Sequence, residues 1–223
     1  MIDSVFVISH SSMANNKITS TVQDQTITTP QFDLLIIKDF FDGEACRDVV
    51  DEMRRSTAGA ALTYGKGEGA VDERIRRARR VSPSAETVAY VTRRLEEQRQ
   101  NLEGHFGVAL SGYEEAQFLC YRVGDFFVAH QDGNTGLVNL DTDRTRKVSV
   151  TIFLNNQSAE WQSDTYDGGS LVFSDWRTGS RHEVSGEAGT LVAFRSETTH
   201  EVTPVTHGDR YAIVSWYGQY GPQ

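Results

Sequence analysis

The sequence contains few cysteines and no long apolar run. Only two of its 223 residues are cysteines, Cys46 and Cys120, so a disulfide framework is not expected and both thiols are expected to be buried or inert. No segment approaches the roughly 20 apolar residues that cross a membrane as a helix. The N-terminus also lacks the cationic and apolar regions of a secretory signal. These absences predict a cytoplasmic protein without a membrane partner.

An excess of positive charge is lacking as well. Lys and Arg number 22 against 31 Asp and Glu, which gives a formal net charge of −9 at pH 7. This balance disfavours nucleic acid as a partner, because nucleic-acid-binding surfaces are strongly basic. Five arginines between residues 74 and 80 oppose the trend. They would suit an acidic substrate or a nucleic acid, but a solvated basic loop is the simpler interpretation.

The composition is that of an ordinary globular protein, with 38% hydrophobic and 24% charged residues. Residues 1–30 are polar and are expected to form an N-terminal arm, and residues 31–223 are expected to form a single domain. Within that domain, residues 39–107 should be a helical support. Asp42 precedes apolar residues at helical spacing and predicts a first helix, and Ser84 begins a second helix that ends at Gly104 or Gly107.

Residues 113–220 change character and are expected to form the core of the domain. Short β-branched or aromatic segments, bounded by Gly, Asp, Asn or Pro, predict strands at residues 115–122, 126–130, 147–155, 169–174, 190–195, 200–205 and 211–217. Many strands after two helices predict a mainly β fold with flanking helices, a double-stranded β-helix (jelly-roll) barrel supported by the two N-terminal helices. Two long polar loops, residues 133–146 and 156–168, are expected to be lids or binding loops.

A histidine and an aspartate two residues apart, His130 and Asp132, close one of the predicted strands. Alternate residues of a strand point to the same face, so these two side chains can bind one ion. The pair is a weak indication alone, since a strand histidine is often an ordinary core residue. However, His200 begins another predicted strand, and Arg210 follows it by ten residues. Two histidines and one carboxylate form the facial triad of non-haem Fe(II) oxygenases, which leaves the other side of the metal open.

A longer pattern surrounds these residues. It reads Tyr121-x-x-Gly124-x-x-Phe127-x-x-His130-x-Asp132, then Gly168-Gly169-x-Leu171-x-Phe173, then Gly189-x-Leu191-x-x-Phe194-x-Ser196-x-x-x-His200-x-Val202-x-Pro204-Val205-x-x-Gly208-x-Arg210. The pattern resembles that of the 2-oxoglutarate- and Fe(II)-dependent dioxygenases, in particular their prolyl-4-hydroxylase-like branch. The resemblance covers residues 32–217 and is sharpest from Gln117 onward. Two positions depart from it: Phe127 stands where many members have tyrosine, and Ala212 replaces the serine of an Arg-x-Ser variant found in other branches.

The resemblance implies a role for each residue of the motif. The two histidines and Asp132 would bind Fe(II) and form the catalytic centre, and the presence of Asp132 disfavours the related halogenases. Arg210 would hold the distal carboxylate of 2-oxoglutarate, for which a planar guanidinium is well suited. Tyr121 would donate its hydroxyl to the same carboxylate, with a strand tyrosine that fills the core as the alternative. Thr151 would line the co-substrate pocket or belong to the core.

The activity implied is oxidative decarboxylation of 2-oxoglutarate with O2, which releases succinate and CO2 and hydroxylates an unactivated C–H bond. The cofactor would be Fe(II), with ascorbate as a candidate reductant. The substrate would be an amino acid, a peptide or a small natural product, contacted by Trp161, Asn134 and Arg80. Alternatives are a protein (prolyl) hydroxylase, a non-catalytic cupin-like sensor that binds iron and 2-oxoglutarate, and a nucleic-acid repair dioxygenase, which would depend on the arginine-rich segment alone. The oligomeric state is open, with a homodimer as one candidate.

Overall fold

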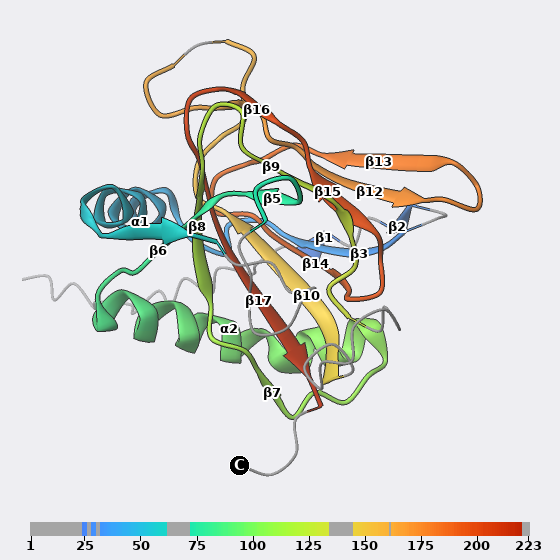
Figure 1. Cartoon of the computed structure of the whole chain (residues 1–223). Helices are drawn as coiled ribbons and strands as arrows, with labels where there is room; N and C mark the ends of the chain where they lie inside the picture. Colours follow the sequence, from blue (N-terminus) through green and yellow to red (C-terminus); the bar gives the residue numbers. More distant parts are fainter. Residues whose placement is uncertain are drawn as a thin grey trace, which may run out of the picture.

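Two β-sheets face each other, and two helices cover the outer face of the larger sheet (Figure 1). The computed structural model describes residues 24–25, 28–29, 32–61, 72–133, 145–160 and 162–219. The larger sheet has ten strands in the order β1 (Asp24–Gln25), β3 (Phe32–Ile37), β14 (Leu191–Arg195), β10 (Arg146–Phe153), β17 (Arg210–Gly218), β8 (Gln117–Tyr121), β6 (Arg79–Val81) and β4 (Ala58–Ala60), with β2 (Thr28–Thr29) beside β3 and β7 (Gly112–Tyr113) beside β17.

The smaller sheet carries five strands. Their order is β13 (Ser180–Val184), β12 (Leu171–Asp175), β15 (His200–Val202), β9 (Phe126–His130) and β5 (Arg76–Arg77). A separate pair consists of β11 (Asp167–Gly168) and β16 (Val205–His207). The β12–β13 hairpin extends away from the rest of the chain (Figure 1).

Both helices begin where the sequence predicts, and the second also ends at a predicted glycine. Helix α1 (Gly43–Arg55) is capped by Asp42, whose side chain accepts a hydrogen bond from the amide of Ala45 at 2.8 Å. Helix α2 (Ala85–Phe106) is capped by Ser84 and ends at Gly107, which adopts the left-handed conformation with φ 62°. This is the usual helix C-terminus, because glycine adopts that conformation without steric cost. Both predicted helices are therefore confirmed.

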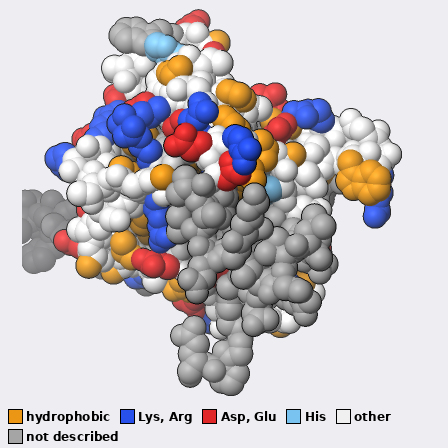
Figure 2. All heavy atoms as spheres, in the orientation of Figure 1, with side chains coloured by type: hydrophobic (Ala, Val, Ile, Leu, Met, Phe, Trp, Pro, Cys, Tyr) orange, Lys and Arg blue, Asp and Glu red, His pale blue; other side chains and the backbone are white. Residues whose placement is uncertain are grey.

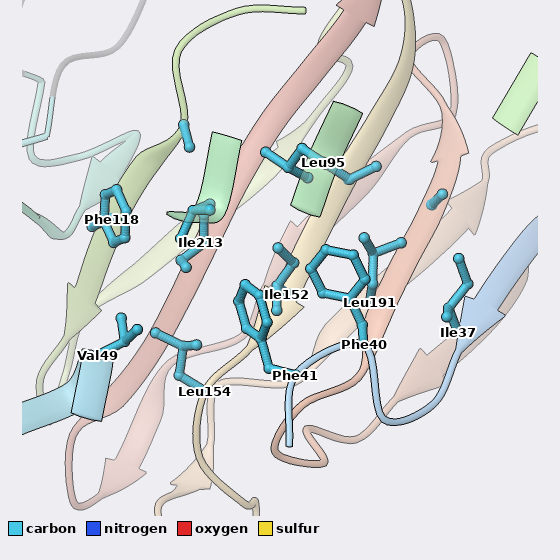
Figure 3. Close-up of a cluster of buried hydrophobic side chains, with 14 of the residues drawn as sticks. Ile37, Phe40, Phe41, Val49, Leu95, Phe118, Ile152, Leu154, Leu191 and Ile213 are labelled. Atoms are coloured by element: carbon cyan, nitrogen blue, oxygen red, sulfur yellow. The ribbon is translucent and has the colours of Figure 1, made fainter. Parts of the chain in front are cut away.

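The larger sheet is buried on both faces, and strand alternation decides which side chains face the helices. Ile213 of β17, Ile152 of β10 and Leu191 of β14 pack against Leu95 of α2 and Phe41 (Figure 3). The intervening residues face the smaller sheet, where Phe153, Phe173, Phe194 and their neighbours form a second apolar cluster. Consequently, every second residue of the central strands β8, β10 and β17 points into the space between the sheets. The candidate functional site lies in that space.

The predicted fold class is confirmed, with two corrections. The chain is mainly β with two flanking helices among the described residues, but the sheets are not closed into a barrel in that part of the chain. The arginine-rich segment, expected to be a solvated loop, instead forms β5 and β6, one strand in each sheet. The expected helical support at residues 39–107 therefore also contributes strands. Likewise, β1 and β2 of the expected N-terminal arm pair with β3.

The surface does not present one uniform charge. On the face shown in Figure 2, Lys and Arg side chains lie among Asp and Glu side chains. In the described part of the chain, neither helix combines the length and the apolar character needed to cross a membrane.

Candidate metal and co-substrate site

Three potential metal ligands meet at one end of the smaller sheet. His130 ends β9, His200 begins β15, and the two are directly opposite in the antiparallel register. Nε2 of His130 lies 3.5 Å from Oδ1 of Asp132, and Nε2 of His200 lies 3.4 Å from Oδ2 of the same carboxylate. One ligand atom from each residue lies within 4.8 Å of the others. A single ion can therefore contact all three.

A β-bulge in β9 directs these side chains. The register shifts between the pairs His130–His200 and Phe127–Val202, so that β9 advances three residues while β15 advances two. The extra residue turns Phe127 and His130 to the same side, where their rings stack with centroids 3.6 Å apart. Because β9 ends at His130, Asp132 reaches the cluster from the following bend and not by strand alternation, as the sequence had suggested.

Hydrogen bonds fix the orientation of both imidazole rings. Nδ1 of His130 lies 2.8 Å from the carbonyl oxygen of Val128, and Nδ1 of His200 lies 2.9 Å from that of Thr198. A carbonyl only accepts, so each Nδ1 carries the proton and donates it. In the neutral ring, this leaves the Nε2 lone pair directed at Asp132. Three electron-rich atoms then face one another, an arrangement that fits a cation.

Burial sets the charge states that metal binding requires. It lowers the pKa of His200 to about 4, and the neighbouring His130 adds to this effect while Asp132 opposes it. Burial also opposes ionisation of Asp132, but the His200 ring, the His130 ring and a hydrogen bond from Trp216 outweigh it and hold the pKa of this carboxyl below its ordinary value. His200 is therefore neutral and Asp132 ionised at pH 7, the forms in which these side chains bind metals.

The backbone around Asp132 is held by Ser196. The carbonyl oxygen of Ser196 accepts hydrogen bonds from the amides of Asp132 and Gly133, both at 2.9 Å. The Ser196 hydroxyl lies 3.0 Å from that of Ser149, on the neighbouring β10. The bend that carries the carboxylate is therefore tied to the larger sheet.

Arg146 holds the same bend from a second side. Its guanidinium donates two hydrogen bonds of 2.6 Å to the Glu114 carboxylate and one of 3.3 Å to the carbonyl oxygen of Asp132. Its Cζ lies 4.0 Å from the ring centroid of Trp216, whose side chain hydrogen-bonds the Asp132 carboxylate. The arginine thus supports both the backbone and the side chain of the acidic ligand.

A cavity between the sheets joins the cluster of potential metal ligands to Arg210. Described residues of both sheets line it, and they are Arg76, Leu119, Tyr121, Phe127, His130, Asp132, Val150, Thr151, Leu171, His200, Val202, Arg210, Val214 and Trp216. Asp132 is the only acidic residue among them. The cavity therefore combines one carboxylate, two histidines and two arginines, and aliphatic and aromatic side chains form most of the remaining lining.

Arg210 is buried at the start of β17 with only 1% of its surface exposed. Its Cζ lies 5.1 Å from the ring centroid of Tyr121, the residue opposite it in the register, and 5.2 Å from that of Phe153. Within the described part of the chain, its Nε and Nη2 atoms have no hydrogen-bond partner. A buried cation with unused donors is costly, so the position fits an anionic ligand.

Tyr166 lies beside this arginine and is equally buried. Its hydroxyl has no hydrogen-bond partner among the described residues. Burial raises the pKa of Tyr166, while the positive charge of Arg210 and the proximity of its guanidinium to the hydroxyl oppose that rise. Two glycines make room for the pair: a Cβ on Gly186 would clash with the Tyr166 hydroxyl, and one on Gly169 would lie 3.0 Å from Cδ of Arg210. Three unused donor atoms therefore share one buried position.

The other predicted site residues are distributed as follows. Tyr121 and Thr151 line the cavity, as expected, and both are buried. Arg80 does not line it, and instead lies on β6 with its Nη2 4.0 Å from a carboxylate oxygen of Glu115. Asn134 and Trp161 lie outside the described residues.

Sequence reasoning missed four residues near the site: Arg76, Arg146, Tyr166 and Trp216. Tyr166 lies within a loop that was predicted to bind ligands, and nothing in that loop distinguishes it from Trp161 or its other neighbours. Trp216 could have been found from its spacing on β17, because residues an even number of positions from Arg210 share its face of the strand, the inner one.

Comparisons with known proteins agree with the geometry. Residues 116–218 match the family model of the 2OG-Fe(II) oxygenase superfamily, whose members use Fe(II) and 2-oxoglutarate. A PKHD-type hydroxylase of Paracoccus denitrificans is 39% identical over 100 residues, 44% of this chain and 40% of the relative. A PKHD-type hydroxylase of Cupriavidus pinatubonensis is 36% identical over 100 residues, again 44% of this chain and 40% of the relative. The chain thus matches about 40% of the length of these curated relatives.

Solved structures give the same result over more of the chain. A Pseudomonas putida prolyl-4-hydroxylase superposes with a TM-score of 0.65 and 25% identity, covering 86% of this chain and 95% of the other. A Trichoplax adhaerens prolyl hydroxylase, solved with a hypoxia-inducible-factor peptide, has a TM-score of 0.64 and 20% identity and shares the fold, over 85% of this chain and 84% of that one. The resemblance to prolyl-4-hydroxylase-like 2OG-Fe(II) oxygenases that the motifs indicated is confirmed.

Proposed function

We propose that this chain is an Fe(II)- and 2-oxoglutarate-dependent dioxygenase that hydroxylates an unactivated C–H bond of an amino acid, a peptide or a small natural product. The observation that carries the proposal is the single cavity in which the His130–Asp132–His200 cluster and the buried Arg210 lie together. Metal ligands alone would fit many proteins. An unused buried guanidinium in the same cavity adds a site for an organic anion.

His130, Asp132 and His200 would hold the metal. Two neutral imidazoles and one carboxylate on one side of an ion leave the opposite positions free, which is the donor set of non-haem Fe(II) oxygenases. When bound there, Fe(II) and 2-oxoglutarate supply the oxidising chemistry, and the protein supplies binding and orientation. Ser196 and Arg146 keep the carboxylate in place.

Arg210 and Tyr166 would hold the distal carboxylate of 2-oxoglutarate. A guanidinium donates two parallel hydrogen bonds to a planar carboxylate, and the phenol donates a third. This assignment moves the hydroxyl donor from Tyr121 to Tyr166, because the Tyr166 hydroxyl is among the unpaired buried donors and that of Tyr121 is not. Tyr121 and Phe153 would contribute their rings, which flank the guanidinium and exclude water from it.

Prolyl hydroxylation of a protein or peptide is the second candidate. The relatives favour it, since they include PKHD-type hydroxylases and a P. putida prolyl-4-hydroxylase. The two candidates share one metal site and one co-substrate site and differ only in the substrate.

The central experiment uses Fe(II) and 2-oxoglutarate without oxygen. The complex should show a visible charge-transfer band, and oxygen with candidate substrates should then produce succinate. Asp132→Ala should abolish the band and the hydroxylation, whereas Asp164→Ala, a change of an exposed carboxylate, should alter neither. A wild-type protein without the band would refute the proposal. A band without substrate-stimulated succinate, for either substrate class, would favour a sensor.

Arg210→Ala separates the co-substrate site from the metal site. It should strongly weaken the binding of 2-oxoglutarate while leaving the affinity for the metal near that of the wild type. Arg181→Ala removes an exposed arginine of the smaller sheet and serves as the control. An unchanged affinity for 2-oxoglutarate in Arg210→Ala would show that the anchor lies elsewhere.

A further inference from the structure

The side chain of Asn155 makes three hydrogen bonds to backbone groups near the proposed co-substrate site. Asn155 follows β10 and is buried. Its Nδ2 donates to the carbonyl oxygens of Asp209, at 2.9 Å, and Asp164, at 3.2 Å, and its Oδ1 accepts from the amide of Tyr211 at 2.9 Å. Because a carbonyl accepts and a backbone N–H donates, these partners fix the orientation of the side-chain amide. The proposed metal and co-substrate sites do not include this residue.

Two of these hydrogen bonds hold the chain on either side of Arg210. Asp209 directly precedes Arg210 and Tyr211 directly follows it, and both bind the same side-chain amide. The paired residues of β10 and β17 end two residues before Asn155, so this side chain extends the attachment beyond the backbone ladder. On its other side, Arg210 pairs with Tyr121 of β8. The backbone that carries the buried guanidinium is therefore held from both neighbouring strands, and Asn155 provides one of these supports.

The third hydrogen bond holds the loop that carries Tyr166. Its acceptor, the carbonyl oxygen of Asp164, lies two residues before Tyr166. The same loop lies against the turn that precedes β17, since a Cβ on Gly208 would come within 2.3 Å of the carbonyl oxygen of Thr165. Asn155 thus joins the two segments that supply the proposed donors to the co-substrate.

We propose that Asn155 is a positioning residue for 2-oxoglutarate, which holds Arg210 and Tyr166 at the spacing that one carboxylate requires. The inference rests on the proposed function, in which these two side chains bind the distal carboxylate. A hydrogen bond weakens steeply when its length or angle departs from the optimum, so donors from separate segments act together only if the segments are fixed relative to each other. Asn155 is not among the residues that line the cavity, and it therefore acts through the two donors.

Binding measurements with two 2-oxo acids separate positioning from a general structural role. 2-Oxobutyrate has the metal-binding end of 2-oxoglutarate but lacks the distal carboxylate. With Mn(II) in place of Fe(II), calorimetry of Asn155→Ala should show about tenfold or greater weakening of 2-oxoglutarate binding, but a change within about twofold for 2-oxobutyrate and for Mn(II). Asn156→Ala changes an exposed neighbour, whose side chain accepts a hydrogen bond from the amide of Ala188, and should match the wild type. Equal weakening of both acids, or unchanged binding of 2-oxoglutarate, would overturn the inference.

A double-mutant cycle tests whether Asn155 acts through the anchor. In an Arg210→Ala background, Asn155→Ala should weaken 2-oxoglutarate binding further by about threefold at most, because the main group that it positions is absent. The same tenfold or greater loss in both backgrounds would show that Asn155 acts independently of Arg210 and would overturn the inference. If Arg210→Ala alone leaves the affinity for 2-oxoglutarate unchanged, the proposed co-substrate site fails instead.

A second variant covers a failure of Asn155→Ala to fold. Asn155→Asp keeps an oxygen for the Tyr211 amide and removes both donated hydrogen bonds, and the same results are expected from it. If neither variant folds, amide hydrogen exchange of the wild-type protein with Mn(II) decides. Exchange at the Tyr211 amide should slow when 2-oxoglutarate is added and should not respond to 2-oxobutyrate. Equal responses to the two acids would contradict the role of Asn155.

Discussion

The hydroxyl of Tyr166 leads to a prediction in which stability and binding change in opposite directions. In the protein without ligands, this hydroxyl is buried and has no hydrogen-bond partner among the described residues. An unsatisfied buried polar group costs about 1–3 kcal/mol. Tyr166→Phe should therefore raise the free energy of unfolding of the ligand-free protein by about 1 kcal/mol, after allowance for the small void that it leaves. For a chain of this length, that corresponds to a rise in Tm of about 2–4 °C.

The same substitution should weaken the binding of 2-oxoglutarate. A hydrogen bond to a charged group contributes about 1.5–3 kcal/mol, which corresponds to a loss of roughly 10–100-fold in affinity. Thermal unfolding in the presence of a chelator measures the first effect, and anaerobic titration of the charge-transfer band measures the second. A stabilised protein that binds its ligand less well is the expected combination.

Tyr217→Phe is the matched control. Tyr217 is also fully buried, but its hydroxyl donates a hydrogen bond of 2.7 Å to the carbonyl oxygen of Leu95. Its removal should lower the free energy of unfolding by about 1 kcal/mol and leave the affinity for 2-oxoglutarate unchanged. If Tyr166→Phe behaves like Tyr217→Phe, the Tyr166 hydroxyl has a structural partner and no role in binding the carboxylate.

Three further predictions concern the surroundings of the site. Arg146→Met should weaken metal binding by about 10–100-fold and destabilise the fold by about 3 kcal/mol, because it breaks a largely buried ion pair with Glu114. The control Arg181→Met, which breaks an exposed ion pair, should destabilise the fold by less than about 1 kcal/mol. Gly186→Ala should displace Tyr166 and weaken the binding of 2-oxoglutarate, whereas a Cβ at Gly104 in α2 meets open space, so Gly104→Ala should be neutral or slightly stabilising. Equal affinities of the two variants for 2-oxoglutarate would contradict the close contact between residue 186 and Tyr166. Burial raises the pKa of both Cys46 and Cys120 to about 11, so thiol reagents at pH 8 should label both cysteines in the denatured protein but neither in the folded protein. The free energy of unfolding should decline above about pH 9, because the thiols of the unfolded chain ionise there while those of the folded protein are still neutral. Rapid labelling of the native protein would contradict this prediction.

The helices and most of the longer strands could be predicted because their signals are local. Asp42 and Ser84 cap helices through hydrogen bonds to amides three residues away, and Gly107 ends a helix through its own backbone conformation. Strand β13 was missed because it is largely exposed and polar, so its residues show little of the apolar character by which strands are recognised. Its pairing with β12 is decided by the neighbouring strand.

The site could be predicted only in part, because several of its features depend on partners far along the chain. The proposed metal ligands and Arg210 follow a spacing that the sequence shows directly. In contrast, Arg76 lies among other arginines, and only its pairing with Phe127, some fifty residues later, turns it inward. The bulge in β9 contains neither glycine nor proline and appears only in the register with β15.

The two halves of the site are built on supports of different rigidity. Arg210 lies on β17, a central strand of the larger sheet that is paired on both sides and buried along nearly its whole length. Two of the proposed metal ligands, His130 and His200, lie on short strands of the smaller sheet, where β9 exposes Val128 and neighbouring Ala129 and its partner β5 has two residues. Few buried contacts make a segment easier to open locally. The hydrogen bonds from Asp132 and Gly133 to Ser196, and from Arg146 to Asp132, compensate by fixing the acidic ligand to the larger sheet. The geometry of the proposed metal site is thus set largely from the sheet that holds Arg210, which keeps the two halves of the candidate site in register.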